Sequence, residues 1–416
     1  MKSIRKNCST LRWQWSSKVL IVAFSLTFAG LVTPPSAHAQ PASRIVRPRM
    51  LIGEHDPLTG LNILRARHAA GARPSDGIDG WALTYLLTRD ESFAKKAVEE
   101  MRRTHPPELV GSRTYPEYVK WSLAFDWLYN YPGFDAQLKD RVALELLKAA
   151  EKMMEDQSLK EVQLAMYHNY PVRYLTLAIF ALTAIEGQPS VESRAAPLRA
   201  RAQEVFDHIL DLTNFITPDG GYHESMDYQR ITYAPLALLA ELRRTVGNND
   251  PARRYTVFHH YTDTYLYKVL PDGTTARDDD NEFPYLQWED NICFGYAINR
   301  FKDPFAAWLL RQSGWPSRKD WRIPITQFLW DDPEVTPRNR LTQTMPRFPA
   351  TTSFAELETS SCATASAPIR PGLSLIQVHT WLSTAISIRT ISRFITKVIW
   401  RPKVAPTTPI LRVRTT

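Results

Sequence analysis

The sequence predicts a mainly α-helical protein, and three observations support this fold class. Apolar residues recur at spacings of three and four over long stretches of the chain, which is the period of an amphipathic helix. Proline and glycine residues separate these stretches, and segments with strand-like alternation are almost absent before residue 343. Successive antiparallel helices with short connections can close into a bundle, a solenoid or an α/α toroid. Because the sequence has no clean repeat of fixed length, the residues alone do not decide between these three architectures.

The first segment, residues 1–39, has the organisation of a secretory signal peptide. Basic residues precede an apolar run over 19–32, and an Ala-His-Ala cleavage signal ends at Ala39. The run is too short to cross a bilayer comfortably. We therefore expect cleavage after Ala39, a periplasmic or secreted mature chain, and no stable membrane anchor. A retained anchor is the alternative interpretation.

The body of the chain, residues 40–346, is where the helical pattern is strongest. About ten helices are expected there from the apolar period and the breakers between them. The clearest stretches cover 81–103, 139–156, 172–187, 198–214 and 233–248.

Charge and cysteine content exclude two classes of protein. Residues 40–346 hold 37 basic and 41 acidic residues, so the basic excess of the whole chain comes from its two ends. A mildly acidic body carries no nucleic-acid footprint. Cys293 and Cys362 are far apart and lack metal-binding spacing, so no disulfide framework is expected.

The last segment, residues 347–416, differs abruptly in composition. It holds nine Lys or Arg and two Asp or Glu, is rich in Thr, Ser and Ile, and has no sustained period. A disordered basic tail is one interpretation. A frameshift is the other, because a shifted reading restores Asp, Gly and alternating apolar residues and turns residues 386–388 into His-Gln-His. In that case a β domain of the parent protein is corrupted here.

Two polar clusters stand at the heads of apolar helices. His168 and Asn169 precede one helical stretch, and His223, Glu224 and Tyr228 precede another. These side chains can transfer protons or donate hydrogen bonds. Their positions predict a cleft rimmed by helix ends.

Four segments, in this order, resemble the heparinase II/III-like polysaccharide lyases, which are relatives of alginate and heparin lyases. They are AFDWLYN, YHNYPVRY, GGYHESMDY and LPDGTTARDDD, at 124–130, 167–174, 220–228 and 270–280. The resemblance implies an α/α toroid, an incomplete barrel of antiparallel helices, over residues 40–346. It also implies an antiparallel β-sandwich after the toroid, of which residues 347–416 would be the corrupted remnant.

The resemblance further implies β-elimination on a polysaccharide that contains uronic acid. Tyr228 would be the acid and also a candidate base, His168 the base or the group that stabilises the phenolate, and Asn169 the group that neutralises the uronate carboxylate. The family often has Asn before His, whereas this chain has His168 before Asn169, so the division of roles is open. A second His from the β domain has no counterpart in the printed frame, which puts the activity of this chain in doubt. No cofactor is required.

Further residues are expected to bind substrate, each with a structural alternative. Arg173 lies one helical turn after Asn169 and could pair with the uronate or with a structural carboxylate. His223 and Trp288 could contact the sugar, and Glu224 could do so or cap the helix that begins near Ser225. An acidic cluster at 278–280 fits a solvated turn better than a cation site. The sequence shows no set of metal ligands, and it leaves open whether the protein binds a structural metal ion.

Two other functions compete with the lyase. A glycoside hydrolase on the same helical fold would use a carboxylate pair, such as Glu224 with Asp227 or with one of the acidic residues at 278–280. A non-catalytic carbohydrate-binding or degenerate protein is the third. The expected partner is an acidic polysaccharide or oligosaccharide, and the polymer, endo or exo action and oligomeric state are left open.

Overall fold

The computed structural model describes most of the body of the chain. Its contacts divide the chain after Val46, and every described helix belongs to the unit that starts at Arg47. The signal segment and the tail, with the expected β-sandwich remnant, lie outside the described residues. These are 45–109, 111–155, 168–222, 225–247, 249–268, 286–312 and 322–338.

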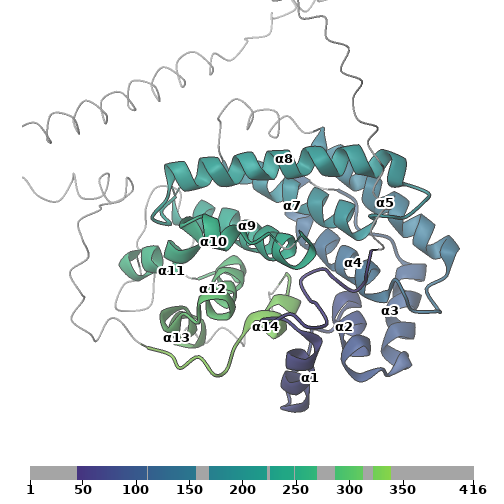
Figure 1. Ribbon diagram of the computed structural model, residues 1–416, viewed down its shortest axis with the longest axis horizontal. Helices are drawn as coiled ribbons and strands as arrows, with labels where there is room; N and C mark the ends of the chain where they lie inside the picture. The colour runs from purple at the N-terminus through teal and green to yellow at the C-terminus, as the bar shows by residue number, and fades with distance from the viewer. Residues whose placement is uncertain are drawn as a thin grey trace, which may run out of the picture. The chain divides into compact units, whose positions relative to one another are not determined.

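The described residues form a mainly helical structure, which confirms the predicted fold class at this level (Figure 1). Within them we find no strand, and Gly53 and Gly60 form an isolated bridge. The helices are α1 (Leu61–Ala69), α2 (Ile78–Thr88), α3 (Glu91–Arg103), α4 (Tyr115–Leu128), α5 (Ala136–Met154), α7 (Asn169–Ala184), α8 (Glu192–Ile216), α9 (Met226–Gly247), α10 (Pro251–Arg254), α11 (Val257–Lys268), α12 (Trp288–Phe301), α13 (Pro304–Gln312) and α14 (Ile325–Trp330), with a 3-10 turn η1 (Gly111–Thr114).

One expected helix is two helices. The stretch 81–103 was predicted as continuous, but α2 ends at Thr88 and α3 begins at Glu91. Arg89 adopts a left-handed conformation with φ 63°, and the Asp90 side chain caps α3 by accepting from the Ser92 amide at 2.9 Å. The apolar period continues across this turn, so the period alone could not reveal the break.

Helix α8 begins at Glu192, before the predicted stretch 198–214, and helix α9 begins at Met226, close to the expected start near Ser225; each contains a proline. Pro197 lies inside α8 and Pro235 inside α9. A proline removes one backbone hydrogen bond and usually ends or kinks a helix. Here the apolar residues on both sides of each proline are buried against neighbouring helices, and this packing outweighs the local cost.

Helices α4, α7, α9 and α12 pack side by side in that order. Two of these helices also pack against a helix that is adjacent in the chain and runs in the opposite direction. The start of α8 meets the end of α7, because Arg199 Nη1 donates to the Leu182 carbonyl at 3.2 Å. The start of α11 likewise meets the end of α12, where the His259 and Phe301 rings lie 4.2 Å apart. Helices α7 and α8, and helices α11 and α12, therefore form two helical hairpins.

A segment that we call the strap, residues 47–60, crosses the carboxyl-terminal ends of these four helices. Its Arg47 bonds to Asp126 at the end of α4 and to the Ala184 carbonyl at the end of α7. Farther along the strap, the Leu51 amide donates to Thr245 of α9 at 3.1 Å.

The strap then reaches α12, because the Leu58 carbonyl accepts from Asn299 at 3.5 Å. Since all four carboxyl-terminal ends meet one segment, the four helices run in the same direction. Their amino-terminal ends therefore lie together at the other end, about 20 Å or more away along the helix axes.

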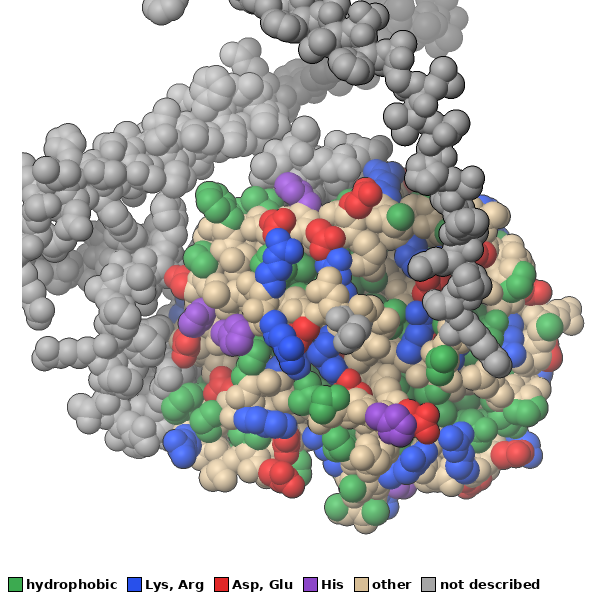
Figure 2. All heavy atoms as spheres, viewed as in Figure 1, with side chains coloured by type: hydrophobic (Ala, Val, Ile, Leu, Met, Phe, Trp, Pro, Cys, Tyr) green, Lys and Arg blue, Asp and Glu red, His purple; other side chains and the backbone are tan. Residues whose placement is uncertain are grey.

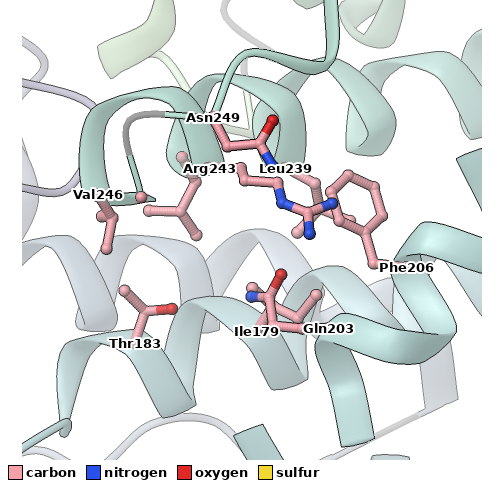
Figure 3. A pocket seen from close by; sticks show the side chains of 10 residues that line it. Ile179, Thr183, Gln203, Phe206, Leu239, Arg243, Val246 and Asn249 are labelled. Atoms are coloured by element: carbon pink, nitrogen blue, oxygen red, sulfur yellow. The ribbon is translucent and has the colours of Figure 1, made fainter. Parts of the chain in front are cut away.

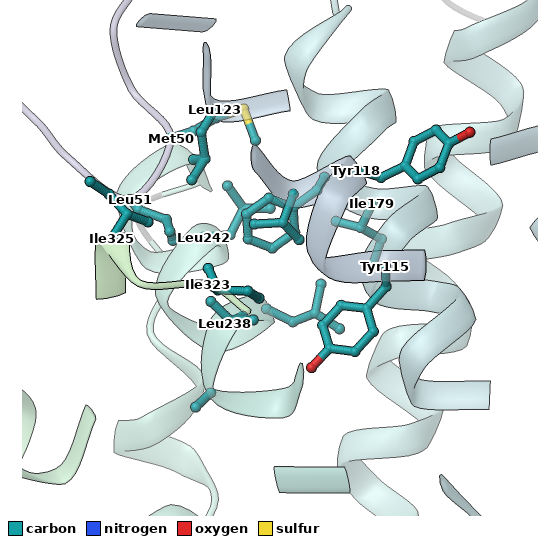
Figure 4. Close-up of a cluster of buried hydrophobic side chains, with 14 of the residues drawn as sticks. Met50, Leu51, Tyr115, Tyr118, Leu123, Ile179, Leu238, Leu242, Ile323 and Ile325 are labelled. Carbon is teal, nitrogen blue, oxygen red and sulfur yellow. The ribbon is translucent and has the colours of Figure 1, made fainter. Parts of the chain in front are cut away.

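The ends of the row are also connected. Arg67 of α1 donates to the Leu329 carbonyl of α14 at 2.8 Å, α14 packs on α12, and α1 packs on α2. Figure 4 shows Met50 and Leu51 of the strap in an apolar cluster with Ile323 and Ile325. These four side chains are fully buried. The core thus joins segments from both ends of the described chain.

The surface carries both signs of charge. On the face shown in Figure 2, Lys and Arg side chains are interspersed with Asp and Glu rather than gathered into one patch. In the described part of the chain, no helix combines the length and apolar character needed to span a bilayer.

Candidate functional site

The amino-terminal end of α7 carries three of the predicted site residues. His168 is the N-cap residue, with the extended backbone that this position requires. Asn169 is only 2% exposed, and its Oδ1 accepts from Arg173 Nη1 at 3.3 Å. The predicted one-turn relation between Asn169 and Arg173 is therefore confirmed. Asn169 therefore orients the Arg173 guanidinium at the amino-terminal end of α7.

An exposed aromatic ring lies beside Arg173. The Arg173 guanidinium lies over the Tyr170 ring, 5.7 Å from its centroid. Tyr170 is 47% exposed, and the His168 ring meets it edge to face at 5.8 Å. A cation beside an exposed aromatic ring, next to an imidazole, is an arrangement suited to an acidic sugar.

Tyr228 lies in the first turn of α9, the helix that packs beside α7. It is partly buried and packs against the core. Because α7 and α9 are parallel neighbours, the structure brings Tyr228 to the same end of the unit as His168, Asn169 and Arg173. His223 and Glu224 lie outside the described residues.

The turn before α9 is held by specific contacts. Gly220 has φ +81°, and a Cβ there would lie 2.6 Å from the His260 carbonyl, so this position requires glycine. The Gln229 Nε2 donates to the Gly220 carbonyl at 2.8 Å, and the Tyr233 hydroxyl donates to the Gly221 carbonyl at 3.0 Å. These bonds fix where α9 begins, and hence where Tyr228 lies.

A buried ion network joins α9 to α12. Arg230, 1% exposed, forms a salt bridge with Asp227 and lies 3.6 Å from Asp290 Oδ2 through Nη1. The Tyr261 hydroxyl donates to Asp290 Oδ1 at 3.0 Å. Burial raises the pKa of Asp290 to about 6, although Arg230 and the Gln287 amide favour its charged form. The network fixes the heads of α9 and α12 together.

The head of α12 adds Trp288 and Glu289. Trp288 is partly buried; its ring lies 6.3 Å from that of Tyr115 at the head of α4, and the Arg322 guanidinium lies 5.6 Å from its centroid. Burial raises the pKa of Glu289, and the charges of Arg230, Arg173 and Arg322 oppose the shift. The structure thus gives Trp288 a place near the candidate site, as a packed ring.

Several residues of this site were not predicted from the sequence: Tyr115, Arg230, Glu289 and Asp290. Tyr115, Glu289 and Asp290 lie far from the two polar clusters along the chain and belong to no short motif. The one available signal was Arg230, two positions after Tyr228.

A cavity of about 270 Å³ lies elsewhere, between α7, α8 and α9 (Figure 3). It is lined by residues that include Ile179, Gln203, Phe206, Leu239, Arg243 and Val246. These come from the middle of α8 and the carboxyl-terminal halves of α7 and α9, toward the strap. The cavity is therefore separate from the site at the helix heads.

The described residues give no sign of a metal centre: in them, no group of three or more His, Cys, Asp or Glu side chains is placed to hold an ion. The acidic cluster at 278–280 lies outside the described residues. Cys293 is a buried free cysteine, and burial raises the pKa of its thiol, so the thiol is protonated.

Comparison with known proteins gives no assignment. No family model matches the chain, and no curated protein matches it.

Proposed function

We propose that this chain is a polysaccharide lyase that cleaves a uronic-acid polymer by β-elimination. The observation that supports this most directly is that two packed helices begin at the same end of the unit, α7 with His168, Asn169 and Arg173, and α9 with Tyr228. The four residue types are those that the reaction needs: a base, an acid and groups that hold a carboxylate.

In the proposed reaction, Arg173 binds the uronate carboxylate and Asn169 holds the guanidinium in place. The helix heads of α4, α7, α9 and α12 add partial positive charge, about half an elementary charge each. Neutralising the carboxylate acidifies the C5 proton. The base removes that proton, the C4–C5 double bond forms as the C4–O bond breaks, and the acid protonates the leaving oxygen.

Tyr228 is the proposed acid, and His168 is the proposed base or the group that stabilises the phenolate. No cofactor enters this scheme. The closed circuit of contacts through α2, α4, α7, α9, α12, α14 and α1 supports an α/α toroid as the fold. We also propose that the protein acts outside the cytoplasm, on the basis of the signal-like segment 1–39.

The hydrolase alternative is less well supported. Asp227, one of its proposed carboxylates, is buried and forms a salt bridge with Arg230, so its carboxylate is engaged in a structural ion pair. Its other candidates, Glu224 and the cluster at 278–280, lie outside the described residues.

The test is to incubate the full chain with a panel of uronic-acid polymers and record the ultraviolet absorbance of unsaturated uronate ends. We expect Tyr228→Phe to lower the rate by roughly 10² to 10⁴. The matched control is Tyr129→Phe. The Tyr129 hydroxyl donates to Gln188 Oε1 at 2.9 Å, near the carboxyl-terminal ends of α4 and α7 and therefore far from the candidate site. New reducing ends without absorbance would indicate a hydrolase, and binding without any product would indicate a non-catalytic protein.

A further inference from the structure

Tyr115, the first residue of α4, has an unsatisfied hydroxyl. The residue is 2% exposed, and its Oη has no hydrogen-bond partner in the described structure. Figure 4 shows the Tyr115 ring beside the apolar cluster, with the hydroxyl at its lower left. A buried hydroxyl without a partner costs about 1–3 kcal/mol, and native proteins rarely leave one.

A second donor near Tyr115 is in the same condition. Arg173 Nε is buried and has no hydrogen-bond partner among the residues that the structure describes. Helices α4 and α7 are packed parallel neighbours, so Tyr115 at the start of α4 and Arg173 near the start of α7 lie at the same end of the unit, where the charge of each group affects the other. Burial and the nearby Glu289 raise the pKa of Tyr115, so its hydroxyl keeps its proton and can donate.

Two unsatisfied donors in one locality, one of them on a cation, call for an acceptor that carries negative charge. A carboxylate fits, because its two oxygens can accept from two donors at once. We propose that Tyr115 and Arg173 bind the acidic group of the substrate together, and that Tyr115 thereby selects acidic over neutral sugars. The identity of that group as a uronate carboxylate rests on the proposed function. The two unsatisfied donors are observed independently of it.

The test uses Tyr115→Phe in the full chain, which removes only the hydroxyl. Its matched control is Tyr118→Phe, one turn along α4, because the Tyr118 hydroxyl is satisfied by the Pro107 carbonyl at 2.9 Å. The probes are oligomers of glucuronan, mannuronan and galacturonan. Cello-oligosaccharides, which carry a hydroxymethyl group where glucuronan carries the carboxylate, are the neutral probe.

We expect Tyr115→Phe to weaken binding of the best uronan roughly ten-fold or more, because a hydrogen bond to a charged group is lost. Its unfolding temperature without ligand should stay equal or rise, since no native bond is lost. Binding of cello-oligosaccharides should be equally weak in both proteins. Tyr118→Phe should behave in the opposite way, with a lower unfolding temperature and unchanged uronan binding.

Three results would overturn the proposal. One is unchanged uronan affinity in Tyr115→Phe, and another is a wild-type chain that binds none of the three uronans. The third is a ligand-free Tyr115→Phe that is destabilised as much as Tyr118→Phe, which would mean that water already satisfies the hydroxyl. A wild-type chain that binds uronans through Tyr115 but forms no unsaturated product would instead refute the lyase and leave this inference standing.

Discussion

The Asp126 carboxylate is the main anchor of the strap, and its removal gives a quantitative test of the fold. It is fully buried and accepts from Arg47 Nη1 at 2.9 Å, from the Arg49 amide at 2.8 Å and from the Met50 amide at 3.0 Å. The substitution Asp126→Asn keeps the shape but removes the charge and one acceptor. It leaves the Arg47 guanidinium, 7% exposed, without its counter-ion.

We expect Asp126→Asn to lower the free energy of unfolding by about 3–5 kcal/mol, the usual cost of breaking a buried ion pair. At about 2–4 °C per kcal/mol for a domain of this size class, the midpoint of thermal unfolding falls by roughly 6–20 °C. Arg47→Met should cost less, because Asp126 then still accepts from two backbone amides. The double variant should be less destabilised than the sum of the two single variants by about 1 kcal/mol or more.

The assay is urea unfolding followed by far-ultraviolet circular dichroism, with a thermal scan as a second measurement. The control is Glu91→Gln, which removes an exposed ion pair with Lys95 and should change stability by less than about 0.5 kcal/mol. A loss below about 1 kcal/mol in Asp126→Asn, or strictly additive single variants, would refute the account of the strap as an ion-paired clamp.

Two more predictions concern a buried acid and a glycine. Burial raises the pKa of Asp79 to about 6, and the charge of Lys120 opposes this shift. Ionisation of Asp79 is therefore less favourable in the folded state than in the unfolded state. The free energy of unfolding should fall as the pH rises from about 4 to above 6. Asp79→Asn should therefore gain stability over the wild type across that range, by roughly 3 kcal/mol; a difference independent of pH in urea titrations would contradict this. Gly220→Ala should cost well over about 1 kcal/mol, because the strained φ adds to the clash with His260, whereas Gly111→Ala has a positive φ and open space and should cost only the strain. Equal losses in the two glycine variants would show that the clash is relieved.

The helical class and the residues of two helix heads could be predicted from the sequence, because both depend on short-range periodicity. Asn169 and Arg173 are four positions apart, and helical geometry alone places them together. The break at Arg89 and the continuation of α8 through Pro197 could not be predicted in this way. The break depends on the cap that Asp90 provides, and the continuation depends on packing against other helices. Neither is visible in the local pattern of apolar residues.

The sequence by itself determined which stretches are amphipathic helices and that imidazole, amide, guanidinium and phenol groups stand at two of their heads. Only the tertiary structure decided that four helices run in parallel, because their direction is fixed by a strap whose bonds join residues 47–60 to the far ends of α4, α7, α9 and α12. It also decided that Tyr115 and Arg173, remote along the chain, lie at the same end of two packed helices. The physical reason is that local period is encoded in neighbouring residues, whereas the pairing of buried charges and donors depends on how the whole chain packs.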